Sequence, residues 1–130
     1  LAIPDRPGNR RTDSLLNILE RPGVGLLFMV PGIDETLRVN GTAQIHADPA
    51  LNARLSARGK PAIAAIVVTV REAYVHCGKA LMRSGLWEGA HRLARDAFPT
   101  IGEIIRDQSG DRALPTDRAG IERHYRDTLY

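Results

Sequence analysis

Residues 36–47 constrain the fold of this chain most strongly, because small or apolar side chains alternate with polar ones along them. One face carries Leu37, Val39, Gly41, Ala43 and Ile45. A period of two over this length is typical of a β-strand that places one face in a core. Gly41 stands in the middle of the strand, where a glycine indicates a bulge or bend of the kind that curls a sheet towards a barrel.

Three other segments predict further strands. Residues 24–30 form a continuous apolar run that ends at Pro31-Gly32, which is typical of a strand buried on both sides. Residues 62–75 are rich in β-branched side chains and predict another strand. Leu1-Ala2-Ile3 has the pattern of the end of a strand already under way. We therefore expect that the first strands of the domain precede this segment.

Helices are expected to be short and to cover the sheet. Thr12 or Asp13 caps one that runs to about Glu20 with a leucine-rich apolar face, and another runs to about Arg58 and begins at the favourable pair Asp48-Pro49. Towards the C-terminus the strand signals disappear, and the short helical stretches there have too few apolar residues for a separate core. The sequence therefore predicts a mainly β domain with short helices at residues 1–88 and a helical appendage at residues 89–130.

Composition and charge exclude several classes of function. The chain contains no apolar run near the ~18 residues that a membrane span requires, so no membrane partner is expected. The arginines are scattered among acids and only 5% of the residues are aromatic, so a nucleic-acid surface is not favoured. Cys77 is the only cysteine, which excludes an internal disulfide and fits a reducing compartment. We therefore expect a cytoplasmic protein.

Two adjacent arginines mark a candidate phosphate site within residues 3–14, which read IPDRPGNRRTDS. Arg10 and Arg11 leave a turn that contains proline and glycine and lead into the predicted helix, where Asp13 and Ser14 offer oxygens and backbone N–H groups. A guanidinium binds two phosphate oxygens at once and does not lose its proton. The alternative for such a pair is a solvated basic turn.

A second polar cluster follows the last predicted strand. Lys79 and Arg83 lie four residues apart on a helical turn, so both project to one side, where like charges repel unless an anion lies between them. His76 and Cys77 are neighbours that point to opposite faces of a strand, and no other histidine has ligand spacing to them, so neither a metal site nor a Cys-His pair is expected. The indole ring of Trp87 suits either contact with a bound ligand or ordinary packing within the protein.

Four separated segments together resemble the pyridoxamine 5′-phosphate oxidase-like flavoproteins, which form FMN-binding split β-barrels. These segments are IPDRPGNRR at residues 3–11, VGLLF at 24–28, LRVNG at 37–41 and HCGKALMRSGLW at 76–87. The resemblance covers residues 1–87, and the tail resembles one subgroup of FMN-dependent proteins in that family. It implies a mostly antiparallel split barrel that works as a homodimer, with a cofactor site in each interface groove.

The resemblance assigns cofactor-binding roles to the first half of the site. Arg10 and Arg11 match the Arg-Lys pair with which the oxidases bind the FMN phosphate, and the replacement of lysine by arginine keeps the charge. Thr36 stands where the oxidases have a glutamine that donates a hydrogen bond to the flavin ring. Its shorter hydroxyl reaches the ring only if the ring lies closer or if a water intervenes.

The second half of the site is assigned in the same way. Arg83 and Ser84 match a Gln-Ser pair that in the family reaches FMN across the dimer interface, so Arg83 adds a positive group. In the subgroup that the tail resembles, Lys79 and Trp87 look like part of the same cofactor-binding cluster. The cofactor-binding set implied by the resemblance therefore consists of Arg10, Arg11, Asp13, Ser14, Thr36, Lys79, Arg83, Ser84 and Trp87.

The function implied is that of an FMN-binding oxidoreductase whose substrate is open. The substrate-binding arginine and histidine near the end of the true oxidases have no counterpart in this tail, so a vitamin B6 substrate does not follow. No catalytic residue is assigned, because the flavin itself carries the reaction. The alternative is a non-catalytic split-barrel protein that binds a flavin, a deazaflavin or haem in the same groove.

Overall fold

A computed structural model describes residues 1–8, 11–110 and 115–129. These residues divide into two compact units, Leu1–Trp87 and Glu88–Leu129. Among the described residues, no helix combines the length and the apolar character that crossing a membrane requires.

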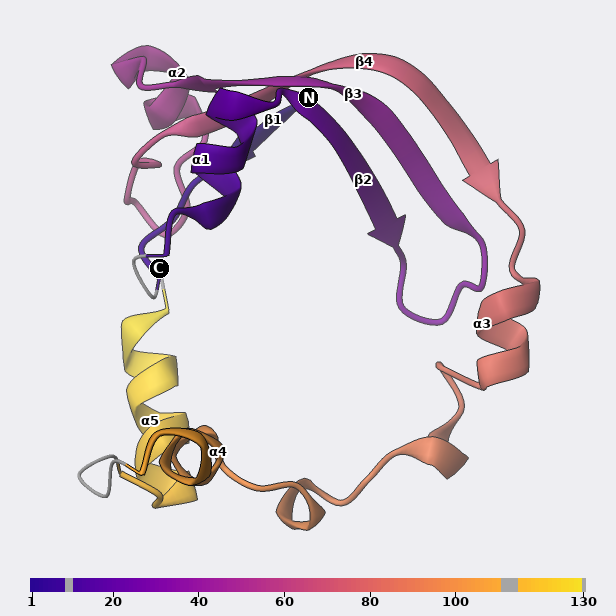
Figure 1. Ribbon diagram of the computed structural model, residues 1–130, viewed down its shortest axis with the longest axis vertical. Coiled ribbons are helices and arrows are strands. Elements are labelled where there is room, and N and C mark those ends of the chain that lie inside the picture. Colours follow the sequence, from indigo (N-terminus) through magenta and orange to yellow (C-terminus); the bar gives the residue numbers. More distant parts are fainter. Residues whose placement is uncertain (9–10, 111–114, 130) are drawn as a thin grey trace. The chain divides into compact units, whose positions relative to one another are not determined.

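The first unit is built on a four-stranded antiparallel sheet, which is strongly curved (Figure 1). Its strands are β1 (Ala2–Pro4), β2 (Gly23–Met29), β3 (Thr36–His46) and β4 (Ala65–His76), and their order across the sheet is β1-β4-β3-β2. The two long strands β3 and β4 pair along their whole length at the centre. The predicted mainly β architecture is confirmed, and the curved sheet is consistent with half of a split barrel.

The predicted irregularity at Gly41 is confirmed as a β-bulge between β3 and β4. Asn40 pairs with Glu72 but Gly41 pairs with Val70, so Arg71 is the extra residue and lies on β4. A Cβ at Gly41 would overlap the backbone carbonyl of Thr69. Glycine is therefore required here because the two backbones approach more closely than any side chain allows, and the bulge bends the sheet at this point.

The core of the first unit is small and comes from the central strands β3 and β4. Val39, Ala43, Ala65 and Val68 are each less than 5% exposed. These side chains are alanines and valines, and none of the larger apolar side chains is fully buried among the described residues. Burial of this size gives only modest hydrophobic stabilisation to a single chain.

The prediction that the apolar run at residues 24–30 is buried on both sides is wrong for the single chain. β2 is an edge strand of the sheet, and Leu27, Phe28 and Met29 are between 42% and 52% exposed. A continuous apolar run fits a strand covered on both faces, but here only Val24 and Leu26, near α1, are partly buried, and the end of the strand is exposed. Edge strands with exposed apolar side chains are ready to pair or pack with another chain.

Three short helices belong to the first unit: α1 (Asp13–Glu20), α2 (Pro49–Arg54) and α3 (Lys79–Ser84). Asp48 caps α2 as expected, because its carboxylate accepts a hydrogen bond of 2.8 Å from the backbone N–H of Ala50. The helix ends at Arg54 rather than at residue 58. The chain after Leu55 instead enters a tight turn, in which Ala57 and Lys60 exchange backbone hydrogen bonds and Arg58 and Gly59 adopt positive φ angles that a helix does not permit.

The second unit contains two single-turn helices, η1 (Gly89–His91) and η2 (Arg95–Ala97), followed by α4 (Ile101–Ser109) and α5 (Arg118–Thr128). Thr100 and Glu103 form a reciprocal capping box at the start of α4. The hydrogen bonds that Thr100 donates to the Glu103 carboxylate lower the pKa of that group. Gly102 allows the backbone of Pro115 to lie directly against α4, because a Cβ there would overlap the Pro115 carbonyl.

Candidate functional site

The segment between β1 and α1, residues 5–12, is called the arginine turn. Its first residue is fixed by two backbone hydrogen bonds, of 2.8 Å from Asp5 N to Ala64 O and of 3.1 Å from Ile63 N to Asp5 O. The turn borders a cavity of about 450 Å³, whose lining includes Asp5, Arg6, Gly8, Arg11, Thr12 and Ile63. The turn therefore encloses a concave space next to the N-terminus of α1. Arg10 lies outside the described residues.

The electrostatic character of this cavity comes from Arg11 and from the start of α1. The Arg11 Nη2 atom lies 2.8 Å from the Asp13 Oδ2 atom, and the two side chains are 72% and 65% exposed. Thr12 occupies the N-cap position of α1, but its side chain makes no capping hydrogen bond. The first turn of a helix carries partial positive charge on its N–H groups. A guanidinium and a helix N-terminus that Thr12 does not cap thus adjoin one cavity.

Asp13 and Ser14 are both placed by α1, but in different surroundings. Asp13 is the ion-pair partner of Arg11. Ser14 instead lines a separate cavity of about 340 Å³ between α1 and the sheet, together with Ile18 and Val24. The structure therefore brings Asp13 together with Arg11, whereas Ser14 faces a different space.

The second predicted cluster lies on and after α3, and Figure 1 shows α1 and α3 at opposite ends of the curved sheet. Lys79 and Arg83 are four residues apart on this six-residue helix, as the sequence predicted. The Ser84 hydroxyl donates a hydrogen bond of 2.9 Å to the backbone carbonyl of Leu81 within the same helix. Within one chain, the structure does not bring this cluster to the arginine turn.

Trp87 and Thr36 lie at the same end of the sheet as α3. The Trp87 indole donates a hydrogen bond of 2.9 Å to the backbone carbonyl of Ile33, in the loop between β2 and β3. Thr36 opens β3, pairs with His76 and is only 8% exposed. Trp87 therefore anchors the loop between β2 and β3. Thr36 is buried in the single chain, and its contact with a flavin ring stays a prediction.

Arg6 belongs to the arginine turn, and no role for it was predicted from the sequence. Its guanidinium donates one hydrogen bond of 3.0 Å to the carbonyl of Lys60 and another to the carbonyl of Leu55. Both acceptors are about fifty positions away along the chain, and both are backbone atoms. No motif in the sequence signals such a contact, because it depends on where the connection between α2 and β4 lies.

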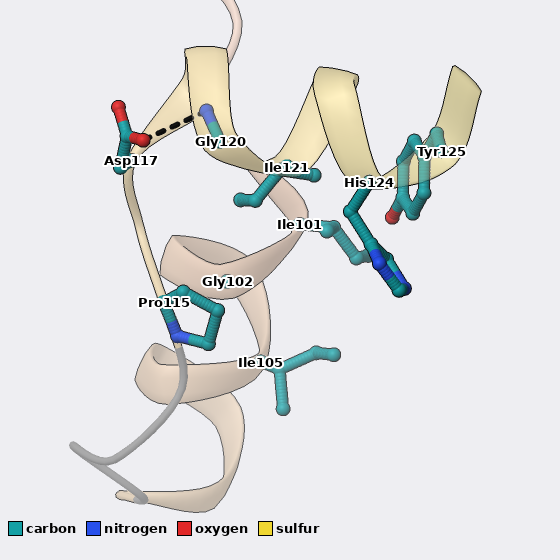
Figure 2. A pocket seen from close by; sticks show the side chains of 9 residues that line it. All are labelled: Ile101, Gly102, Ile105, Pro115, Asp117, Gly120, Ile121, His124 and Tyr125. Carbon is teal, nitrogen blue, oxygen red and sulfur yellow. Dashed lines mark hydrogen bonds between the residues drawn. The ribbon is translucent and has the colours of Figure 1, made fainter. Parts of the chain in front are cut away.

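A third concavity belongs to the second unit and was not predicted. Figure 2 shows this cavity of about 310 Å³ between α4 and α5, with Ile101, Ile105 and Ile121 as its apolar walls. Asp117 lies at its edge, where its carboxylate accepts a hydrogen bond of 2.7 Å from the backbone N–H of Gly120. Among the described residues, the lining of this cavity contains no lysine or arginine. Among the described residues there is also no cluster of three or more His, Cys, Asp or Glu side chains suited to a metal ion.

Comparison with known proteins gives one match. The family model described as pyridoxamine 5′-phosphate oxidase matches residues 1–77, which is more than half of the chain. The matched region includes the arginine turn and all four strands and ends before α3. No curated protein and no solved structure matches the chain.

Proposed function

The chain belongs to the pyridoxamine 5′-phosphate oxidase-like family, and from this premise we propose that it is an FMN-binding oxidoreductase. The observation that carries the proposal is the arginine turn, where Arg11 and the N-terminus of α1 adjoin one cavity. Proteins of this family typically bind a flavin, and FMN is the flavin whose single phosphate suits this corner. The substrate is a small molecule whose identity the family does not fix.

A phosphate monoester fits the donors of the arginine turn. The planar fork of Arg11 suits two phosphate oxygens, and Arg10 adds a second guanidinium next to it in the chain. The N-terminus of α1 offers backbone N–H groups and a favourable dipole. The ion pair between Arg11 and Asp13 is exposed and contributes less than about 1 kcal/mol, so little stability is lost when Arg11 turns to a phosphate.

The proposed site is completed by a second copy of the chain. Lys79, Arg83, Ser84 and Trp87 are distant from the arginine turn in one chain, because α1 and α3 lie at opposite ends of the sheet. The exposed apolar side chains of β2 supply a surface that a partner copy would cover. In such a homodimer the α3 end of one copy faces the arginine turn of the other, and Arg83 of each copy adds positive charge to its partner's site.

The division of labour in this proposal explains why no acid–base pair stands out. The flavin supplies hydride chemistry when it is bound. Arg10, Arg11 and the N-terminus of α1 hold the phosphate, and the cluster around α3 walls the site. The chain's own residues thus bind and orient the cofactor and limit the access of water.

The experiment that tests this function begins with the protein as purified. Denaturation should release a yellow compound whose absorption spectrum and mass identify it as FMN. Apoprotein that takes up neither FMN nor another flavin would contradict the proposal. Release of a deazaflavin would show that the site holds this related cofactor in place of FMN. Oxidation of the bound reduced flavin by oxygen, or its reduction by a nicotinamide donor, would distinguish an enzyme from a carrier.

Subunit mixing tests the shared site. A variant with Arg10→Ala and Arg11→Ala and a variant with Arg83→Ala and Ser84→Ala should each bind FMN poorly alone. A mixed dimer has one site with no substitution, so equal mixing and subunit exchange should restore about a quarter of the wild-type binding sites. No recovery, with exchange demonstrated by a mass-tagged subunit, would show that both halves of the site come from one chain.

A further inference from the structure

One side chain of the arginine turn, that of Arg6, reaches away from the turn to a distant segment of the chain. Arg6 is the second residue after β1, and its half-buried side chain extends to the connection between α2 and β4. There its Nη1 atom donates to the Lys60 carbonyl at 3.0 Å and its Nη2 atom donates to the Leu55 carbonyl. Arg6 also lines the cavity that Arg11 lines. One guanidinium therefore ties the cavity wall to a distant backbone segment.

The two acceptors of Arg6 belong to a stiff piece of backbone, here called the carbonyl platform (Leu55–Lys60). Ala57 and Lys60 exchange two backbone hydrogen bonds of 3.0 Å, so the Lys60 carbonyl already has a fixed direction. The turn between them requires positive φ angles at Arg58 and Gly59. Leu55 is the C-cap residue of α2, and a helix C-terminus favours a cation beside its last carbonyl groups. The platform thus has backbone hydrogen bonds of its own besides those from Arg6.

We infer that Arg6 is a positioning residue for phosphate binding, an inference that rests on the proposed function. Its guanidinium is engaged by two backbone carbonyls, so it does not itself hold the phosphate. It fixes the start of the arginine turn to the carbonyl platform, and this keeps Arg11 and the N-terminus of α1 on one cavity. Lysine cannot replace it, because a single ammonium on a flexible stem does not span two carbonyls as a planar fork does.

The test measures the affinities of Arg6→Lys, Arg6→Gln and wild-type protein for FMN and for riboflavin, the same ring without a phosphate. Flavin fluorescence gives both dissociation constants, and thermal unfolding shows that each variant is folded. Both variants should lose about tenfold in FMN affinity, as expected for losing hydrogen bonds made by a charged group, while riboflavin affinity stays unchanged. Equal losses in the two variants would identify geometry rather than charge as the cause.

Three results would overturn the inference. Unchanged FMN affinity in both variants would show that Arg6 does not position the turn. Equal losses for FMN and riboflavin would indicate a general structural role. Loss in Arg6→Gln alone would mean that the charge of Arg6 acts on the phosphate directly. Wild-type protein that binds FMN no better than riboflavin would instead contradict the proposed phosphate site itself.

A second variant covers the case in which neither Arg6 variant folds. Gly59→Ala keeps Arg6 and strains the carbonyl platform, because φ at this position is +76° although the space around it is open. It should weaken FMN binding selectively over riboflavin. Unchanged selectivity in a folded Gly59→Ala protein would contradict the role given to the platform.

Discussion

Replacement of Arg10 and Arg11 together by alanine is expected to lower the affinity for FMN by about a hundredfold or more, because each guanidinium makes charge-assisted hydrogen bonds. The fold should be unaffected. Arg11 is 72% exposed in its side chain, and its ion pair with Asp13 is worth little to stability at such exposure. The flavin-to-protein ratio after gel filtration and the thermal unfolding curve measure the two effects separately.

A matched control removes the same charge elsewhere. Arg92 and Arg123 are exposed in the second unit, and alanine at both positions lowers the net charge by the same amount. This control should retain full FMN content, because an effect of overall charge falls off with screening by salt. Equal loss of FMN in the control would point to a non-specific effect of charge. Unchanged flavin content in the Arg10→Ala, Arg11→Ala protein would contradict the proposed phosphate site.

Substitution of Gly41 by alanine is expected to cause the largest loss of stability. The added Cβ would overlap the backbone carbonyl of Thr69, which is held in the central ladder of the sheet and cannot move without breaking pairs between β3 and β4. Overpacking against a rigid neighbour costs about 3 kcal/mol, so urea unfolding followed by circular dichroism should give a clearly lower midpoint. The bulge at Arg71 would be disturbed in the same variant.

Gly23→Ala is the control for this prediction. Gly23 pairs with Thr42, one residue along β3 from Gly41, but a Cβ at Gly23 meets nothing within 4 Å. Its free energy of unfolding should change by less than about 0.5 kcal/mol. A Gly41→Ala protein as stable as the Gly23→Ala protein would show that the close approach of β3 and β4 at the bulge does not require glycine.

Local pattern was sufficient to predict the elements that depend on local geometry. The alternation along β3, the irregularity at Gly41 and the cap of α2 by Asp48 all follow from residues within a few positions of one another. The surroundings of β2 were not predictable in this way. Its apolar run has the pattern of a strand covered on both faces, but whether anything covers it is decided by other segments or other chains.

The candidate site shows the same limit. The arginine pair and the spacing of Lys79 and Arg83 are local motifs, and they were identified from the sequence. Ser14 faces another cavity because one residue on a helix turns the side chain by about 100°, which places Ser14 with Ile18 rather than with Arg11. The contacts of Arg6 with distant carbonyl groups depend on tertiary structure alone.

A crystal structure of the protein with FMN tests the central claim most directly. The account predicts that the FMN phosphate lies within hydrogen-bond distance of the Arg10 and Arg11 guanidinium groups and of the backbone N–H groups that begin α1. FMN bound elsewhere with this corner empty, or a corner closed by neighbouring backbone, would contradict it.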